Sequence, residues 1–414
     1  MGGVSMEWKE VTLGDLCEIS SSKRIFAKEY QSDGVPFYRG KEIIAKQKGN
    51  AISNELFISR NRYEEIKARY GVPQQRELLL TSVGTLGVPY VIKEEEFYFK
   101  DGNLTWFRHF NGLDVEYLYY WFLSPYGKNE INTKAIGSTQ KALTIDSLSK
   151  FDIKIPANLD DQRRIASILS SLDRKIELNN KINADLEEMA QAIFKNWFID
   201  FEPFKDGKFV DSELGMIPEG WKVGRLDEIA DVVGGSTPSK AKPEYYTQKG
   251  IAWLTPKDLS NHPAVYTSRG EIDITEEGYN STSTKLMPKG TILFTSRAPI
   301  GYISIAQNDI CTNQGFKSLV PKKAGTCFLY CFLKYVTPVI ENKSTGSTFK
   351  EASGSLMKSL QVIMPEQKVF EVFETIVSPL FARIESLEKE NSRLSLLRDT
   401  LLPRLMSGEL EVPE

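Results

Sequence analysis

Charged, amide and hydroxyl side chains recur in short loops of this sequence, among aromatic residues that make up 11% of the chain. Lysine, arginine and hydroxyl groups bind phosphates, whereas arginine distinguishes guanine and asparagine or glutamine distinguishes adenine by paired hydrogen bonds. The stretch from Arg39 to Arg76 carries nine basic and four acidic residues. These residue types suit double-stranded DNA, and a solvated charged face is the alternative explanation of the same stretch.

Two loops share the pattern Gly-Ser-Thr-x-Lys, one at residues 137–141 and the other at 346–350. Each offers hydroxyls and a lysine to a phosphate or a base edge. A simple turn is the alternative, because serine and threonine are common turn formers and the glycines would then serve only the backbone. With weaker candidates from other loops, the predicted DNA contacts are Arg39, Lys41, Arg60, Arg62, Ser82, Ser138, Thr139, Gln140, Lys141, Lys257, Ser296, Arg297, Asn313, Gln314, Ser347, Thr348 and Lys350.

The sequence lacks the motifs of common catalytic sites. No GxxxxGK[ST] phosphate loop, GxGxxG turn or GxSxG elbow occurs. The two histidines, His109 and His262, stand outside any HExxH or Cys/His cluster. The acid and lysine at 65–67 lie in a charged run, whereas metal-assisted hydrolysis needs several convergent carboxylates. We therefore predict a non-catalytic chain with no metal site of its own.

The elements that carry these residues occur twice. A Trp-Lys pair, a Leu-x-Thr-Ser run followed by a glycine, and the Gly-Ser-Thr-x-Lys loop recur in the same order, at offsets between 209 and 216. Several ordered markers are hard to obtain by chance, and loop insertions explain the small drift. The sequence thus predicts a duplicated unit of about 210 residues.

A long helix is predicted after each globular segment. Residues 157–202 contain neither glycine nor proline, and apolar positions there alternate in steps of four and three. The same rhythm runs from Phe373 to Leu401, where Ser378-Pro379 predicts a kink or a new helix start. A helix of about 40 residues is roughly 60 Å long and needs a partner. We predict that the two helices pair with each other, with packing on their globular neighbours as the alternative.

The predicted pairing is antiparallel, with an asparagine near the middle of each stripe. A buried asparagine of this kind sets the register of a coiled coil at some cost in stability. We therefore expect Asn183 and Asn391 to approach across the seam. The predicted seam residues are Leu172, Ile176, Asn183, Leu186, Ile193, Leu380, Ile384, Asn391, Leu394 and Leu401.

The composition indicates a globular chain with more than one domain. It has 414 residues, 41% apolar and 26% charged. No run of about 18 apolar residues and no basic-then-apolar start occurs, and the four cysteines are scattered. We expect a cytoplasmic protein without a membrane span or disulfide framework. The net charge of −3 divides into +1 for residues 1–156, −4 for 157–214, +4 for 215–365 and −4 for 366–414.

The predicted fold class is mixed α/β. Two globular domains form a pseudo-two-fold repeat, separated and joined by two long helices that form an antiparallel coiled coil. Within the globular segments the patterns predict strands at 77–82, 89–93, 291–295 and 302–306, and helices at 55–70, 115–123 and 326–337.

This layout resembles the specificity subunit of type I restriction-modification systems, over nearly the whole chain. The resemblance rests on Gly-Met-Ile-Pro-Glu-Gly-Trp at 215–221, on Asp-Gln-Arg-Arg-Ile at 161–165 and Pro-Glu-Gln-Lys at 365–368, and on Leu-Leu-Pro-Arg-Leu-Met-Ser-Gly-Glu at 401–409. It implies target-recognition domains at 1–156 and 215–365, a linker at 203–214, and helices at 157–202 and 366–414 that correspond to the family's central and C-terminal conserved regions.

The resemblance also implies a function. The chain would read a bipartite, asymmetric DNA sequence, one half per recognition domain, while its helices act as a ruler and dock two modification (methyltransferase) subunits. S-adenosylmethionine, ATP and magnesium would bind to partner polypeptides, including any restriction (ATP-dependent translocase and nuclease) subunits. The chain itself would be a non-catalytic subunit with no cofactor.

A structural scaffold is the alternative from a different class. The paired helices would then hold two modules that bind protein or carbohydrate, with no role for DNA. Basic loops gathered on one side of the molecule would favour DNA, and scattered basic residues would favour the scaffold.

Overall fold

The computed structural model describes residues 6–49, 52, 55–137, 141–297, 299–345 and 350–412. Its contacts divide the chain into unit 1 (Met1–Glu177 with Ser392–Glu414) and unit 2 (Leu178–Asn391). Each unit holds one globular head and part of each long helix, α7 (Leu159–Phe198) and α12 (Gln367–Ser407). Head 1 is residues 6–158 and head 2 is residues 199–366. Both heads mix strands and helices, which confirms the predicted mixed α/β class.

Head 1 contains two four-stranded sheets, with strand orders β2-β9-β6-β7 and β3-β5-β4-β8. Strands β1 and β10 pair antiparallel where the chain enters and leaves the head. The elements are β1 (Trp8–Thr12), α1 (Leu13–Leu16), β2 (Glu18–Ser20), η1 (Ala27–Glu29), β3 (Tyr30–Gln31), β4 (Val35–Tyr38), α2 (Gly40–Gln47), β5 (Leu56–Ile58), α3 (Arg60–Tyr70), β6 (Leu78–Thr81), β7 (Pro89–Val91), β8 (Tyr98–Phe99), β9 (Leu104–Arg108), α4 (Val115–Leu123), α5 (Pro125–Lys134), α6 (Ile145–Ser149) and β10 (Asp152–Pro156).

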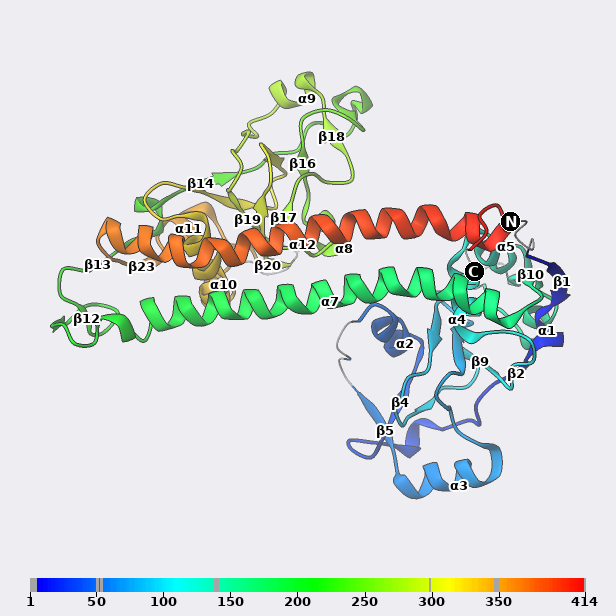
Figure 1. Cartoon of the computed structure of the whole chain (residues 1–414). Helices are drawn as coiled ribbons and strands as arrows, with labels where there is room; N and C mark the ends of the chain where they lie inside the picture. Colours follow the sequence, from blue (N-terminus) through cyan, green and yellow to red (C-terminus); the bar gives the residue numbers. More distant parts are fainter. Residues whose placement is uncertain are drawn as a thin grey trace, which may run out of the picture. The chain divides into compact units, whose positions relative to one another are not determined.

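Head 2 contains a five-stranded sheet of order β14-β22-β19-β20-β17, and β13 pairs antiparallel with β23 (Figure 1). The elements are η2 (Glu202–Phe204), β11 (Phe209–Val210), β12 (Ile217–Pro218), β13 (Lys222–Arg225), η3 (Leu226–Glu228), β14 (Ala230–Gly234), η4 (Pro243–Tyr245), β15 (Tyr246–Thr247), β16 (Trp253–Leu254), α8 (Pro256–Asn261), β17 (Tyr266–Thr267), β18 (Asp273–Ile274), α9 (Glu276–Asn280), β19 (Ile292–Ser296), β20 (Ile300–Ala306), β21 (Cys311–Thr312), β22 (Lys317–Pro321), α10 (Thr326–Lys343), α11 (Gly354–Lys358) and β23 (Gln361–Met364).

The strand orders confirm the internal repeat. The order β2-β9-β6-β7 of head 1 returns in head 2 as β14-β22-β19-β20, and the β1–β10 pair returns as β13–β23. The parallel pair β4–β8 likewise returns as β16–β21. The two heads therefore share a framework although their loops differ in length.

Two predicted helices differ from the observed ones in their bounds, the first at its start and the second at its end. The predicted helix at 55–70 is wrong in its first turn, because Leu56–Ile58 pairs with β3 and β4 as strand β5, and α3 starts only after the N-cap Ser59. The predicted helix at 326–337 continues to Lys343 as α10, with Pro338 inside it. The predicted helix at 115–123 is confirmed as α4.

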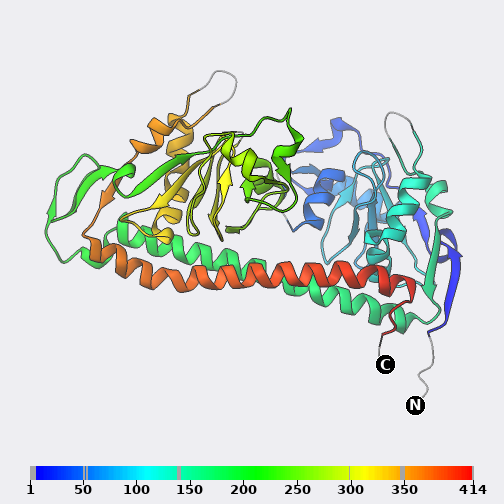
Figure 2. The same cartoon turned by 90° about the horizontal axis from the view of Figure 1, so that it is seen from above.

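In each unit the two long helices run antiparallel and share the core of the head, and they lie side by side in Figure 2. In unit 2, Phe198 lies near Phe370, whereas Asn179 bonds Asn391. In unit 1, Ile165 and Leu169 of α7 share a core with Leu402, Leu405 and Met406 of α12, which also contains α4. The predicted alternatives are thus both realised, because each helix packs on its partner and on its own head.

The register of the helix pair differs from the prediction by one turn. Asn391 accepts a hydrogen bond from Asn179 at 2.9 Å and donates one to Asn180 at 2.8 Å, so the expected pairing of Asn391 with Asn183 is wrong. Asn183 is buried nonetheless. The cause is that antiparallel pairing depends on where the two stripes cross, which sequence spacing on each helix does not define.

The other predicted seam residues are buried or half-buried. Ile384 is fully buried, and the remaining eight are half-buried: Leu172, Ile176, Leu186, Ile193, Leu380, Asn391, Leu394 and Leu401. Helix α12 continues through Pro379 and ends at Ser407. The predicted new helix start at Ser378 is therefore wrong. The helix packs on its partner and on head 2 on both sides of this proline, which offsets the lost hydrogen bond.

Gln162 joins helix α7 to head 1 through its amide group. The fully buried side chain accepts the Asp114 N–H at 2.8 Å and donates to the Gly112 and Pro156 carbonyls at 3.1 and 2.9 Å. Buried backbone groups need such partners because leaving one unpaired costs about 1–3 kcal/mol. This residue therefore sets the position of α4 on the long helix.

Two carboxylates of helix α12 perform the same task in unit 2. Glu374 accepts the N–H groups of Cys327 and Phe328 at 3.3 and 2.8 Å, at the start of α10. Glu388 accepts the N–H groups of Val265 and Tyr266 at 2.7 and 3.0 Å. Among the described residues, no helix is long and apolar enough to cross a membrane.

We expect Gln162→Ala to lower the free energy of unfolding by about 2–4 kcal/mol, because it leaves one N–H and two carbonyls unpaired inside the protein. Denaturant unfolding followed by circular dichroism measures the change. Ser167→Ala, on an exposed position of the same helix, is the matched control and should change the free energy by less than about 0.5 kcal/mol. A cost for Gln162→Ala as small as that of the control would contradict the role of this glutamine.

Glu388 should make the stability depend on pH. Burial raises the pKa of Glu388 from 4.5 to about 7, and Glu187 and Glu385 add to the rise, while the two N–H bonds oppose it. Between these pH values the folded protein holds a proton that the unfolded chain has released, so stability falls as the pH rises through this window. The fall is on the order of 3 kcal/mol at about 1.4 kcal/mol per pKa unit.

Glu388→Gln removes this titration. The difference in unfolding free energy between the native chain and the variant should therefore decrease from pH 4.5 to pH 7 and stay constant above that. Urea unfolding at a series of pH values measures it. A difference that is independent of pH would show that Glu388 titrates normally.

Candidate nucleic-acid interface

In unit 1 the hairpin between β6 and β7 lies against the residues that flank the Gly-Ser-Thr-x-Lys loop. Val83 and Ile136 each form an isolated β-bridge with Ala142. The Ser82 carbonyl accepts the Leu143 N–H at 2.9 Å. Both flanks of the loop are therefore tied to the base of the hairpin.

Unit 2 repeats this arrangement with other residues. Arg297 and Thr345 each form an isolated β-bridge with Glu351, and the Ser296 carbonyl accepts the Ala352 N–H at 2.9 Å. The hairpin between β19 and β20 thus meets the residues that flank the second Gly-Ser-Thr-x-Lys loop in the same way. The structure brings together, twice, two segments that lie more than 50 residues apart in the sequence.

A third loop joins them, after β8 in head 1 and after β21 in head 2. The Ser82 N–H donates to the Asn103 carbonyl at 2.8 Å, and the Ser296 N–H donates to the Gly315 carbonyl at 2.8 Å. In unit 2 this loop contains the predicted contacts Asn313 and Gln314. The loop in unit 1 was not predicted.

A fourth loop, after β2 and after β14, was missed in both units. In unit 1 the Gly102 N–H donates to the Ser21 hydroxyl at 3.5 Å, and Arg24 pairs with Asp101 at 2.8 Å. In unit 2 the Thr237 hydroxyl donates to the side-chain carbonyl of Gln314.

A sequence signal for this fourth loop was present. Ser-Ser-Ser-Lys at 20–23 and Gly-Gly-Ser-Thr-Pro-Ser-Lys at 234–240 are polar runs that follow the repeated Trp-Lys marker in both copies. We name the four segments together the loop cluster, which comprises the described residues 20–24, 82–87, 101–103, 137 and 141–142 in unit 1, and 234–240, 296–297, 299–301, 313–315 and 350–351 in unit 2.

The glycine of each hairpin is required by the backbone and by packing. Gly87 and Gly301 have φ angles of +75° and +98°, in the region that favours glycine. A Cβ atom at these positions would lie 2.4 Å from Ile131 and 2.7 Å from Thr337. Packing against the helix behind it, α5 in unit 1 and α10 in unit 2, therefore fixes the orientation of each hairpin.

Ser82 and Ser296 do not face solvent. They are 2% and 0% exposed, and their hydroxyls bond Thr105 at 2.5 Å and the Gly315 carbonyl at 3.1 Å. The prediction of a direct DNA contact is wrong for these two serines, because their hydroxyl groups support the loop cluster from inside. They help to position neighbours that are exposed.

Lys41 and Lys257 occupy matched, exposed positions in the two heads. Each is the second residue of a short helix, α2 or α8, and their side chains are 53% and 73% exposed. Their carboxylate neighbours, Glu42 and Glu271, lie 3.5 and 3.7 Å away. Both lysines are exposed, and their contact with phosphates stays a prediction.

The arginines of head 1 are bound to carboxylates. Arg39 donates hydrogen bonds to both carboxylate oxygens of Glu42, from Nε to Oε2 at 3.2 Å and from Nη2 to Oε1 at 2.7 Å. Arg60 pairs with Glu96 at 2.5 Å. Arg62 pairs with Glu29 and Glu65 at 3.1 and 2.8 Å. These carboxylates lie outside the loop cluster, so the structure does not bring the α3 arginines to it.

The remaining predicted contacts flank or belong to the loop cluster. Lys141, Gln314 and Lys350 are exposed, and Asn313 and Arg297 are half-buried. Asn313 accepts the Gly315 N–H at 2.8 Å through its side-chain oxygen. Five predicted contacts lie outside the described residues: Ser138, Thr139, Gln140, Ser347 and Thr348.

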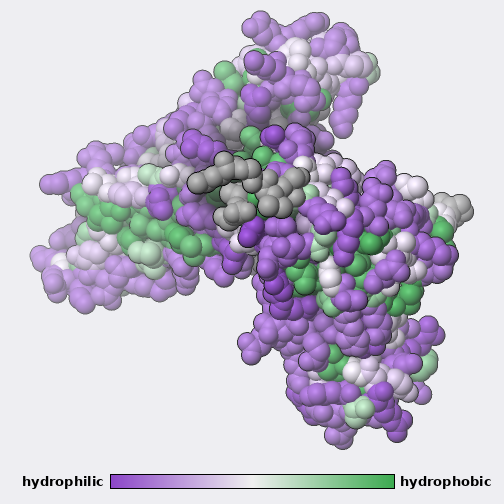
Figure 3. All heavy atoms as spheres, turned by 45° about the vertical axis from the view of Figure 1, so that its right-hand side comes forward, coloured by the Kyte–Doolittle hydropathy of each residue, from purple (hydrophilic) through white to green (hydrophobic). Residues whose placement is uncertain are grey.

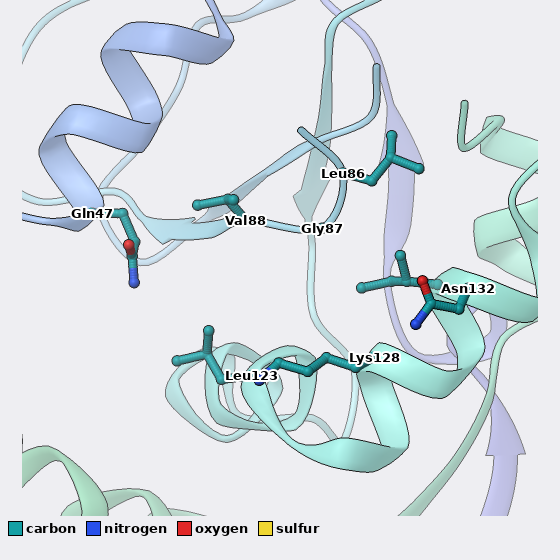
Figure 4. Close-up of a pocket in the computed structure, with 8 residues that line it drawn as sticks. Gln47, Leu86, Gly87, Val88, Leu123, Lys128 and Asn132 are labelled. Carbon is teal, nitrogen blue, oxygen red and sulfur yellow. The ribbon is translucent and has the colours of Figure 1, made fainter. Parts of the chain in front are cut away.

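A cavity of about 260 Å³ lies behind the hairpin of unit 1 (Figure 4). Figure 4 shows Leu86 and Val88 on the hairpin side and Leu123, Lys128 and Asn132 on the helices opposite. Its lining contains no carboxylate, histidine or cysteine. The described residues also contain no group of His, Cys, Asp or Glu that could hold a metal ion.

A second hollow, of about 220 Å³, lies in unit 2 where the end of α7 meets α10 and β23. Its walls include Phe194, Phe332, Tyr335, Val339 and Ile363. Tyr335 and Val339 are 48% and 45% exposed, and apolar side chains are visible on the surface of this unit as green areas in Figure 3. Most of the lining is apolar, and its polar residues are Lys343 and Gln361.

Comparison with known proteins finds the same family in two segments of the chain. The family model described as type I restriction modification DNA specificity domain matches residues 6–188 and 218–395. The MjaIX specificity subunit of a type I restriction enzyme from Methanocaldococcus jannaschii is 41% identical over 190 residues, 45% of this chain and 44% of the relative. The match thus spans less than half of that relative.

Two further relatives cover more of the chain. The HindI specificity subunit of a type I restriction enzyme from Haemophilus influenzae is 28% identical over 329 residues, 65% of this chain and 71% of the relative. The crystal structure of the type I restriction-modification S subunit from M. genitalium has a TM-score of 0.59 at 18% identity and covers 97% of both chains, which shows the fold. Because the family model matches most of the sequence in two copies, this chain belongs to the family of type I restriction-modification DNA specificity proteins.

Proposed function

We propose that this chain is the subunit of a type I restriction-modification complex that reads a bipartite, asymmetric DNA site, one half with each head. The observation that carries the proposal is the loop cluster. Each head builds it with the same backbone hydrogen bonds but different side chains. Base identity is read by side-chain donors and acceptors, so two unlike sets suit two unlike half-sites. Family membership favours this function over the scaffold alternative.

Phosphate contacts are supported by lysines at matched positions. Lys41 and Lys257 begin corresponding helices, and Lys141 and Lys350 end the two Gly-Ser-Thr-x-Lys loops. All four are exposed or largely exposed. Such contacts orient a protein on the duplex without reading sequence. The same set of lysines in both heads supports a similar orientation of each head on its half-site.

The long helices are the proposed docking sites of two modification subunits. Both carry large apolar side chains that neither the seam nor a head covers, with 41% to 71% of each exposed: Leu178, Met189, Val372, Ile376, Leu396 and Leu397. Apolar residues exposed in groups on a surface mark sites of protein interaction. The surrounding acidic residues keep such a surface soluble until a partner covers it.

In this proposal the chain performs no chemical step itself. Methylation with S-adenosylmethionine belongs to the modification subunits. ATP-driven, magnesium-dependent cleavage belongs to restriction subunits where the complex includes them. The chain contributes the choice of DNA sequence and the distance between the two half-sites.

We expect a host that expresses this chain with its modification subunits to methylate one split DNA motif, with two unlike parts separated by a fixed gap. Sequencing that detects modified bases measures this. A host with the modification subunits alone is the control and should show no such motif. A continuous or palindromic motif would contradict the proposal.

Exposed apolar residues on the helices should hold the modification subunits. Met189 and Leu397 are 52% and 46% exposed and lie 208 positions apart, so the repeat places them at equivalent points of α7 and α12. Met189→Glu and Leu397→Glu should each remove one modification subunit from the complex, and the double variant should remove both. Light scattering coupled to gel filtration measures the mass of each complex.

The matched control is Leu286→Glu, a leucine of head 2 with the same 46% exposure as Leu397. It should leave the mass of the complex unchanged. Melting temperatures should be unchanged in all variants, because none of the replaced side chains is buried. Complexes that retain both subunits in the double variant would refute docking at these positions.

A further inference from the structure

The two loop clusters differ most sharply at three matched positions. The first follows the buried serine of the hairpin, the second forms the β-bridge with the first, and the third is the strand residue that bonds the serine hydroxyl. Unit 1 has uncharged side chains at all three positions and unit 2 has charged ones. In the order unit 1 and unit 2, the residues are Val83 and Arg297, Ala142 and Glu351, and Thr105 and Lys317.

The three charged residues of unit 2 contact one another. Arg297 Nη1 lies 3.9 Å from Glu351 Oε2, and Lys317 Nζ lies 3.4 Å from Glu351 Oε1 and 3.5 Å from the Ser296 hydroxyl. Lys317 is 17% exposed, whereas Arg297 and Glu351 are 36% and 41% exposed. The lysine thus lies beneath the pair, and the arginine and the carboxylate both reach solvent.

Arg297 differs from the predicted contact arginines of head 1, because these form short hydrogen bonds to carboxylates. Arg39, Arg60 and Arg62 bond carboxylates at 2.5 to 3.2 Å. Within the described residues, the guanidinium of Arg297 has a single ion pair, at 3.9 Å, which is too long for a hydrogen bond. Its fork of donors is therefore free for a ligand while the Glu351 charge keeps it in place.

The pair of Arg297 and Glu351 matches a base pair better than a phosphate. In the major groove a G·C pair offers the N7 and O6 acceptors of guanine beside the N4 amino donor of cytosine. Arginine binds the former with two hydrogen bonds, and glutamate accepts from the latter. A phosphate, in contrast, would lie against the Glu351 carboxylate and be repelled by it. In unit 1, Val83 and Ala142 offer neither a donor nor an acceptor from their side chains.

We infer that Arg297 and Glu351 are specificity-determining residues that together recognise one G·C base pair in the half-site read by unit 2. This inference rests on the proposed function and assigns the chemistry of one position of the site. Lys317 is a positioning residue that holds Glu351 at the surface. Unit 1 makes no corresponding demand for G·C at the matched position.

The test uses the complete complex of this chain with its modification subunits. One half of the methylated motif should contain a G·C pair whose replacement weakens binding roughly 5- to 150-fold. Arg297→Ala and Glu351→Ala should each reduce discrimination at that same pair, and the other half-site should be unchanged. Arg297→Val with Glu351→Ala copies the side chains of unit 1, which folds with them, and should abolish discrimination there.

Base-modification sequencing reports the motif, and binding to duplexes with single replaced pairs reports the discrimination. Arg225→Ala, an exposed arginine of head 2 paired with Asp227 outside the loop cluster, is the matched control and should leave the motif unchanged. The dependence of binding on salt concentration separates base contact from phosphate contact. Loss of a base contact leaves the slope of that dependence unchanged.

Three outcomes would overturn the inference. If Arg297→Ala weakens binding equally on all sequences and lowers the salt slope by about 1, then Arg297 contacts a phosphate. If complexes with Arg297→Ala, with Glu351→Ala and with the double variant all methylate the same split motif as the native complex, the inference fails and the proposed function stands. If the native complex methylates no split motif, the proposed function fails, and the inference fails with it.

Discussion

The structure depends on covering the apolar stripes of two helices of 40 and 41 residues. Such helices are not stable alone in water, and most of their stability comes from packing. In each unit the stripe of one helix meets the other helix and also the core of a head. Burial of apolar surface has no preferred direction, so polar contacts define how the heads attach. Gln162, Glu374 and Glu388 supply these contacts by bonding backbone groups of the heads.

A constant framework with replaceable side chains follows from this attachment. Buried serines, a glycine with positive φ and backbone hydrogen bonds hold the loop cluster in both heads. The side chains of Arg297 and Glu351 at the surface of the cluster are free to differ from those of unit 1, because these two residues contribute to the framework through their backbone. The charged group of Arg297 and Glu351 in unit 2 therefore occupies a site that carries valine and alanine in unit 1 without any change in the framework.

Much of the fold was predictable because its signals are local or periodic. The repeat, the two long helices and helix α4 depend on spacing within a segment, and these predictions are confirmed. The errors occurred where a distant partner decides the outcome. Leu56–Ile58 has a helix-like neighbourhood but forms a strand because β3 and β4 are available to pair with it. Asn391 meets Asn179 instead of Asn183 because the crossing point belongs to the pair of helices.

The sequence by itself determined the architecture, the repeated segments and the residue types that suit DNA, since composition and periodicity are properties of the chain alone. Only the tertiary structure decided which polar groups are usable. It buried Ser82 and Ser296, bound Arg39 and the arginines of α3 to carboxylates, and left the guanidinium of Arg297 beside Glu351 without a hydrogen bond to another described residue. Hydrogen-bond availability depends on neighbours that are far away along the chain, and folding alone brings those neighbours together.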